Sequence, residues 1–116
     1  MTQYGQPTVV DPLVQYGGRT NRTAWTLYPQ GGSLRLSLRD AYGSAPAIPV
    51  TTTLHWICQD DEIILREPGM YRALQRAGLV QEHCTELATA EGAMIVARLT
   101  ERCLRGLPAE VRDAAW

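Results

Sequence analysis

The sequence predicts an α+β fold, in which an N-terminal antiparallel sheet of about four strands packs against two or three C-terminal helices. Two observations support this prediction. Apolar and polar residues alternate in the first half of the chain, whereas helical periodicity begins only after Glu67, so the strands precede the helices. A chain of 116 residues, 45% of them hydrophobic, can form one domain with its own core. We assign residues 1–20 to an extended N-terminal arm and residues 21–116 to a single α+β domain.

The arm is rich in Gly, Gln, Pro and Thr, which disfavour regular structure. Its apolar residues Val9, Val10, Leu13 and Val14 would tie part of it to the body or add an edge strand. The segment 23–40 then has the pattern of a β-hairpin with one buried and one exposed face.

Two further strands are predicted after a turn-rich loop at residues 42–49. Residues 50–58 are rich in β-branched and aromatic side chains, which favour a strand. Residues 62–66 form a short, almost wholly apolar segment, which also predicts a strand. These complete the sheet of about four strands.

The helical signals are clearest from residue 67 to residue 107. Pro68 suits the first position of a helix, and Gly78 suits the left-handed conformation that ends one. We predict a second helix over 90–107 with Thr89 as its N-cap, and a short third helix after Pro108. Residues 80–88 are ambiguous, and we favour a helix over a strand there.

Composition bounds the class of protein. A formal net charge of −1 argues against a nucleic-acid coat protein or a membrane-surface protein. All the basic residues except histidine are Arg, so Lys-dependent chemistry is excluded. The lack of Lys and of Phe also indicates a GC-rich bacterial or viral genome. Three cysteines in unrelated contexts favour free thiols, so we expect a cytoplasmic protein. The longest apolar runs are too short to span a membrane, so we expect no membrane role.

The sequence contains no convincing catalytic, metal or cofactor motif. His55, Cys58, His83 and Cys84 have the residue types of a zinc site, but residues three apart on a strand point to opposite faces, and adjacent residues diverge. No nucleophile motif surrounds a cysteine, and no glycine-rich loop leads into a helix. We therefore expect no enzyme, no cofactor and no metal, and we rank a small thiol or metal enzyme last.

Several side chains are candidates for contact with a partner. Arg35 and Arg39 should project together from the exposed face of the hairpin, where they can bind phosphate or acidic side chains or simply solvate the sheet. Aromatic residues are also favoured at interfaces. The candidate partner-binding residues are Tyr4, Tyr16, Arg19, Arg22, Arg35, Arg39 and Trp116.

One stretch offers an alternative. Residues 71–80 (YRALQRAGLV), followed by residues 87–92 (LATAEG), resemble the end of a winged-helix regulator of the MarR type. The resemblance implies a recognition helix that closes on Gly-Leu-Val, a two-stranded wing, and a final helix that opens at the second motif. It would place Gln75 and Arg76 on DNA bases and Arg72 on a phosphate.

The first interpretation is a small non-enzymatic protein-binding module, of the kind used as an accessory or inhibitor protein by a bacterium or a mobile element such as a phage. It rests on the small size, the lack of a catalytic constellation and the exposed candidates for contact. The alternative is a winged-helix-like DNA-binding transcriptional regulator. The sequence leaves the identity of the partner and the oligomeric state open.

Overall fold

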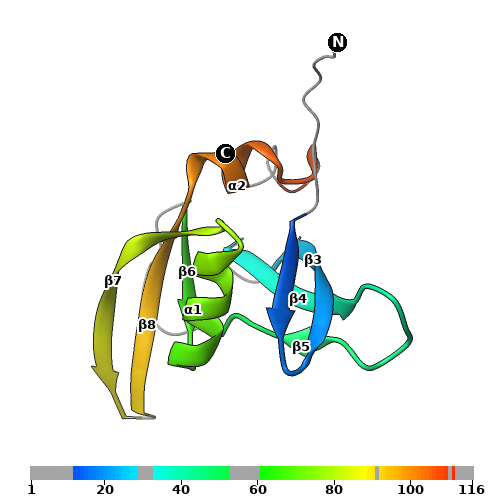
Figure 1. Cartoon of the computed structure of the whole chain (residues 1–116). Coiled ribbons are helices and arrows are strands. Elements are labelled where there is room, and N and C mark those ends of the chain that lie inside the picture. Colours follow the sequence, from blue (N-terminus) through cyan, green and yellow to red (C-terminus); the bar gives the residue numbers. More distant parts are fainter. Residues whose placement is uncertain (1–11, 29–32, 53–60, 91, 110, 112–116) are drawn as a thin grey trace.

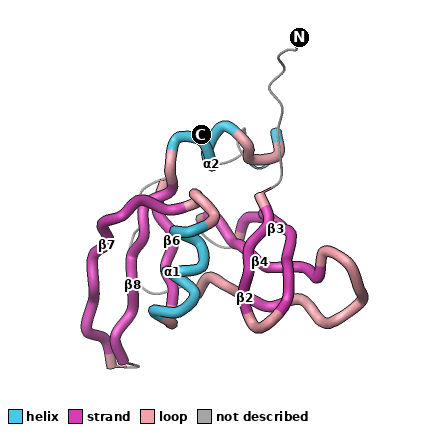
Figure 2. The backbone as a smooth tube through the Cα atoms, viewed as in Figure 1, coloured by secondary structure: helices cyan, strands magenta, loops and turns pink. Residues whose placement is uncertain are grey.

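The computed structural model describes residues 12–28, 33–52, 61–90, 92–109 and 111. They form two antiparallel sheets and two short helices (Figure 1). Strands make up most of the described backbone (Figure 2). The predicted arrangement, one sheet covered by two or three C-terminal helices, is therefore wrong.

The first sheet contains four strands in the order β2-β3-β4-β5. Their bounds are Leu13–Tyr16, Arg19–Leu27, Leu34–Asp40 and Ile48–Pro49. Strands β3 and β4 confirm the predicted hairpin, and β2 is the edge strand that the N-terminal arm was expected to add. Gly17 and Gly18 both have positive φ, so they form the tight primed turn that joins β2 to β3.

The second sheet contains three strands in the order β6-β8-β7. Their bounds are Glu62–Leu65, Gly92–Leu99 and Val80–Thr89, respectively. Helix α1, Pro68–Arg76, connects β6 to β7, and helix α2, Glu101–Arg105, follows β8. Strand β6 confirms the predicted strand over 62–66.

Helix α1 begins and ends as predicted. Pro68 occupies its first turn. Gly78 has a φ of 79°, Leu79 N–H donates to the carbonyl oxygen of Leu74 at 3.0 Å, and Gly78 N–H donates to that of Gln75 at 3.0 Å. These two bonds are the Schellman motif, which satisfies carbonyl groups at the end of the helix.

The helix predictions are wrong for residues 80–88 and for the first half of 90–107, whereas α2 lies in the second half of 90–107. Residues 80–88 lie in strand β7, and residues 92–99, predicted as the first half of a long helix, form strand β8. Thr89 ends β7 at a hairpin turn and caps no helix. The actual N-cap is Thr100, whose hydroxyl accepts the Cys103 N–H at 3.2 Å. The predicted third helix falls largely outside the described residues.

The mistaken assignment of β8 has a physical cause. Ile95 and Ala97 belong to the main core, whereas Met94 and Val96 pack with Ile64 on the opposite side of the sheet. A strand that is covered on both faces becomes an unbroken apolar run, which periodicity cannot distinguish from a buried helix.

The main core lies between the two sheets. Helix α1 packs against β2 on one side and the three-stranded sheet on the other (Figure 1). Its buried residues Met70, Ala73 and Leu74 join the leucines of β4 in one cluster. Of the strand predicted over 50–58, residues 53–58 lie outside the described residues.

Residues 50–52 link the two sheets. Val50 N–H donates to the carbonyl oxygen of Leu36 in β4 at 3.1 Å, and Thr52 N–H donates to that of Ile64 in β6 at 3.0 Å. Across the described ranges, no helix is long and apolar enough to cross a membrane.

Candidate functional site

The outer face of the four-stranded sheet carries three arginines. In the β3–β4 register, Arg22 lies directly opposite Arg39, and Arg35 lies opposite Thr26. Residues paired in this way project from the same face of an antiparallel sheet. The alternate residues of β4, such as Leu36 and Leu38, are buried on the inner face, so all three arginines point away from the core. We call Arg22, Arg35 and Arg39 the arginine face.

The arginine face is compact. The Cβ atoms of directly opposite residues lie about 5 Å apart, which brings Arg22 and Arg39 into close proximity. Arg35 lies four residues from Arg39 along the same strand, a distance of about 13 Å. The pair Ala24 and Ser37 lies between these positions, so only small side chains separate the long ones.

No acidic side chain compensates these charges within the described residues. None of the described ion pairs contains Arg22, Arg35 or Arg39. Like charges directly opposite each other in a sheet reduce its stability. By this rule, an anionic group placed between Arg22 and Arg39 would relieve a repulsion between them.

Aromatic and apolar groups border the arginine face. The guanidinium carbon of Arg35 lies 5.5 Å from the centre of the Tyr28 ring, which is within cation–π distance. The hydroxyl of Tyr28 donates to the carbonyl oxygen of Thr51 at 2.9 Å, which holds this ring in place. Leu13 of β2, paired with Arg22, is 43% exposed.

Two predicted contact residues make hydrogen bonds within the chain. The Tyr16 hydroxyl donates to the Glu67 carboxylate at 2.8 Å, and this hydrogen bond, followed by burial, raises the pKa of Tyr16. Arg19 donates from Nε to Asn21 Oδ1 at 2.6 Å and from a terminal nitrogen to the carbonyl oxygen of Pro46 at 2.9 Å. The structure therefore separates Tyr16 and Arg19 from the arginine face.

The remaining predicted residues lie elsewhere. Tyr4 and Trp116 fall outside the described residues. Arg72 and Arg76 are exposed on helix α1, whereas Gln75 is only partly exposed. Because α1 packs on the core side of the four-stranded sheet, these three residues form a surface separate from the arginine face.

Of the two cysteines in the described ranges, Cys103 is buried and Cys84 is exposed. Burial raises the pKa of the Cys103 thiol to about 12, so this thiol is a poor nucleophile. His83 and Cys84 are exposed neighbours on β7, whereas His55 and Cys58 fall outside the described residues. No group of three or more metal-ligating side chains is present in the part of the chain that the structure describes.

The sequence analysis missed two features of possible binding surfaces. It did not identify the direct opposition of Arg22 and Arg39, although the hairpin pattern contained this information once the turn length was known. It also did not associate Trp25 with Arg102, which line one cleft although they are far apart in the sequence. No local pattern could have predicted that proximity.

Comparisons with protein-family models, curated proteins and solved structures found no significant match.

Proposed function

We propose that this chain is a non-enzymatic protein-binding module that engages an acidic surface of a partner protein through its arginine face. The observation that carries the proposal is the directly opposed pair Arg22 and Arg39, which has no acidic neighbour among the described ion pairs. A site that reduces stability locally is a candidate functional site, because a partner can recover the lost energy. Binding of this kind fits an accessory or inhibitory protein.

The surroundings of the arginines favour a protein partner over a nucleic acid. Arg and Tyr are enriched at protein interfaces, and the stacked Arg35–Tyr28 pair supplies both. Leu13 adds apolar area at the edge of the same face. The net charge of −1 gives no general attraction for a polyanion.

The experiment is affinity capture from a lysate of the source organism with two matched double variants. In the first, Arg22 and Arg39 are changed to Ser; in the second, Arg72 and Arg76 of helix α1 are changed to Ser. Both variants lose the same charge, so only its position differs. Nuclease treatment in parallel identifies any partner that is held through nucleic acid.

The proposal predicts a stoichiometric protein partner that survives nuclease, is lost with the first variant and is retained with the second. Retention of every captured protein by the first variant would contradict it. Circular dichroism of both variants verifies that they are folded.

A second candidate is the DNA-binding regulator, and one observation favours it. Helix α1 is followed directly by the β7–β8 hairpin, which is the helix-then-wing arrangement that the MarR resemblance implies. Two observations weigh against it. The exposed hairpin strand β7 carries Glu82 and Glu86, and the second motif lies at the hairpin turn, where the resemblance requires the start of a helix.

The two functions differ in their dependence on salt. Binding to duplex DNA through Arg72 and Arg76 would weaken steeply as salt rises, because each phosphate contact releases counterions. Fluorescence anisotropy with a labelled random duplex at 50 and 200 mM salt measures this. The DNA-binding alternative requires affinity that falls with salt and disappears in the α1 double variant.

A further inference from the structure

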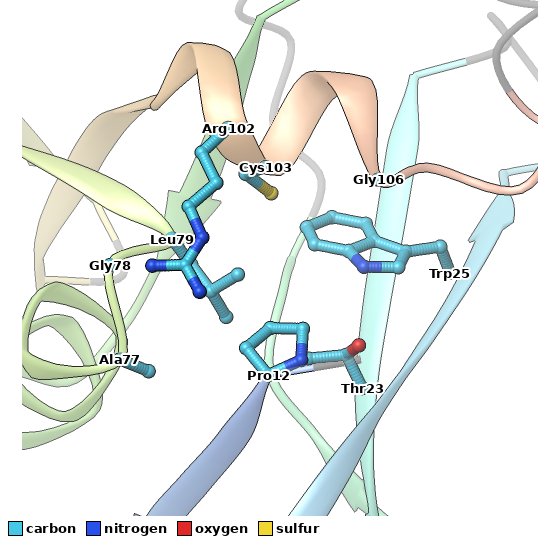
Figure 3. Close-up of a pocket in the computed structure, with 9 residues that line it drawn as sticks. All are labelled: Pro12, Thr23, Trp25, Ala77, Gly78, Leu79, Arg102, Cys103 and Gly106. Atoms are coloured by element: carbon cyan, nitrogen blue, oxygen red, sulfur yellow. The ribbon is translucent and has the colours of Figure 1, made fainter. Parts of the chain in front are cut away.

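A cleft opens between the first sheet, the end of helix α1 and helix α2 (Figure 3). The cleft is open to solvent, and its non-atom space, open solvent included, is about 350 Å³. Thr23 and Trp25 of β3 line one side, and Leu79 and Arg102 line another. Pro12 lies between these sides in the view of Figure 3.

The Arg102 side chain extends from α2 into the cleft, and its guanidinium lies on the side opposite the Trp25 indole ring (Figure 3). Its side chain takes part in no hydrogen bond or ion pair among the described contacts. The guanidinium lies beside Gly78: a Cβ atom placed on this glycine would be 3.6 Å from Nη1 of Arg102, an ordinary van der Waals distance. The guanidinium therefore keeps its donors available beside the backbone of Gly78.

The backbone that carries Arg102 is held in place by Thr100. The Thr100 hydroxyl donates to the carbonyl oxygen of Gly78 at 2.7 Å and accepts the N–H of Cys103. Its backbone N–H donates to the carbonyl oxygen of Leu79 at 3.0 Å. Helix α2 is thus fixed to the end of α1, and the two elements that frame this side of the cleft are joined.

The electrostatics of the cleft favour an anion. Among the described residues that line it, Arg102 is the one cation and none is acidic. Burial raises the pKa of the Cys103 thiol and keeps it neutral. This side chain therefore adds no negative charge that would repel a bound anion. The Thr23 hydroxyl and the Trp25 indole N–H are further hydrogen-bond donors among the lining residues.

We propose that this cleft binds a small organic carboxylate, with Arg102 holding the carboxylate and the Trp25 and Pro12 rings contacting its apolar body. A guanidinium matches a carboxylate in two parallel hydrogen bonds, and an indole ring supplies a large flat apolar surface. One cation suits the single charge of a carboxylate better than the higher charge of a phosphate. This site is separate from the arginine face and does not depend on the proposed function.

The test is an NMR titration with 3-phenylpropionate, which combines one carboxylate with one aromatic ring. The indole N–H signal of Trp25, assigned with a Trp25→Phe variant, reports binding. The uncharged amide of the same acid is the matched ligand control, and inorganic phosphate tests for a site that accepts any anion. Arg102→Gln removes the proposed contact, and Arg105→Gln on the same helix is the variant control, because Arg105 pairs with Glu101 outside the cleft.

The proposal predicts a saturable shift of the Trp25 signal with the acid and binding at least tenfold weaker for the amide, because a charge-assisted hydrogen bond is lost. It predicts a similar loss for Arg102→Gln and none for Arg105→Gln. If the unaltered protein binds 3-phenylpropionate and its amide equally well, the proposal is overturned, and no variant is needed for this test. So would the absence of saturation, binding of phosphate as tight as that of the acid, or unchanged affinity in a folded Arg102→Gln protein.

Discussion

Reversing one charge of the arginine face should stabilise the chain while it removes binding. Arg39→Glu replaces a repulsion with Arg22 by an attraction, because the two residues lie directly opposite each other. Cross-strand charge pairs of this kind contribute about 0.2–1 kcal/mol each, so the combined change is about 1 kcal/mol in favour of the folded state. For a domain of this size, that corresponds to an increase in Tm of about 4 °C.

The assay is thermal and urea denaturation followed by circular dichroism, at 20 and 500 mM NaCl. Arg22→Glu should have the same effect as Arg39→Glu, whereas the double variant places two carboxylates opposite each other and should lose the gain. This double-mutant cycle isolates the pairwise coupling from the effects of the single changes. The coupling should shrink in high salt, because the pair is exposed and its interaction is screened.

The same variants test the functional argument. A substitution that raises stability and abolishes capture of the partner cannot act through unfolding. The reasoning is refuted if Arg39→Glu lowers the free energy of unfolding at low salt, or if the cycle shows no coupling between the two positions. Either result would mean that the placement of Arg22 opposite Arg39 has no effect on the stability of the fold.

Three further predictions concern the fold. Gly78→Ala should lower the free energy of unfolding in urea by about 1–2 kcal/mol because of its φ of 79°, whereas Gly69→Ala, where a Cβ would meet no atom within 4 Å, should not lower it. Thr100→Ala removes the cap of α2 and should cost about 1–2 kcal/mol in the same assay, with Thr100→Ser close to wild type. Burial raises the pKa of the Cys103 thiol from 9.0 to about 12. Between these two pH values only the unfolded chain loses the thiol proton, so the free energy of unfolding should fall as pH rises above about 9. Cys103→Ala should reduce that slope, and iodoacetamide should label Cys84 and spare Cys103 in the folded protein.

Local sequence patterns were sufficient for the β3–β4 hairpin and helix α1. The leucines and polar residues of β4 alternate strictly, because one face of the first sheet packs on the core and the other faces solvent. In α1, the start at Pro68 and the end at Gly78 both follow from backbone chemistry that acts within one turn. In these segments the local preference and the tertiary environment agree.

The second sheet was not predictable in this way. Strand β7 is exposed along residues 81–86 and contains a register shift between Val80 and Cys84, so its side chains show no alternation. Strand β8 is apolar throughout because both of its faces are covered. Neither strand carries a periodic signal, and only their pairing with each other and with β6 makes them strands.

The candidate sites also combine features that the sequence predicts with features that it does not. The sequence by itself determined that Arg35 and Arg39 share an exposed face, because a period of two fixes the direction of side chains along a strand. The position of Arg22 opposite Arg39 needed the turn length of the hairpin as well, and only the tertiary structure decided that Arg19 is bound elsewhere and that Arg102 and Trp25 line one cleft. Those relations depend on strand register and on the packing of α2 against α1, which arise from contacts between residues far apart in the chain.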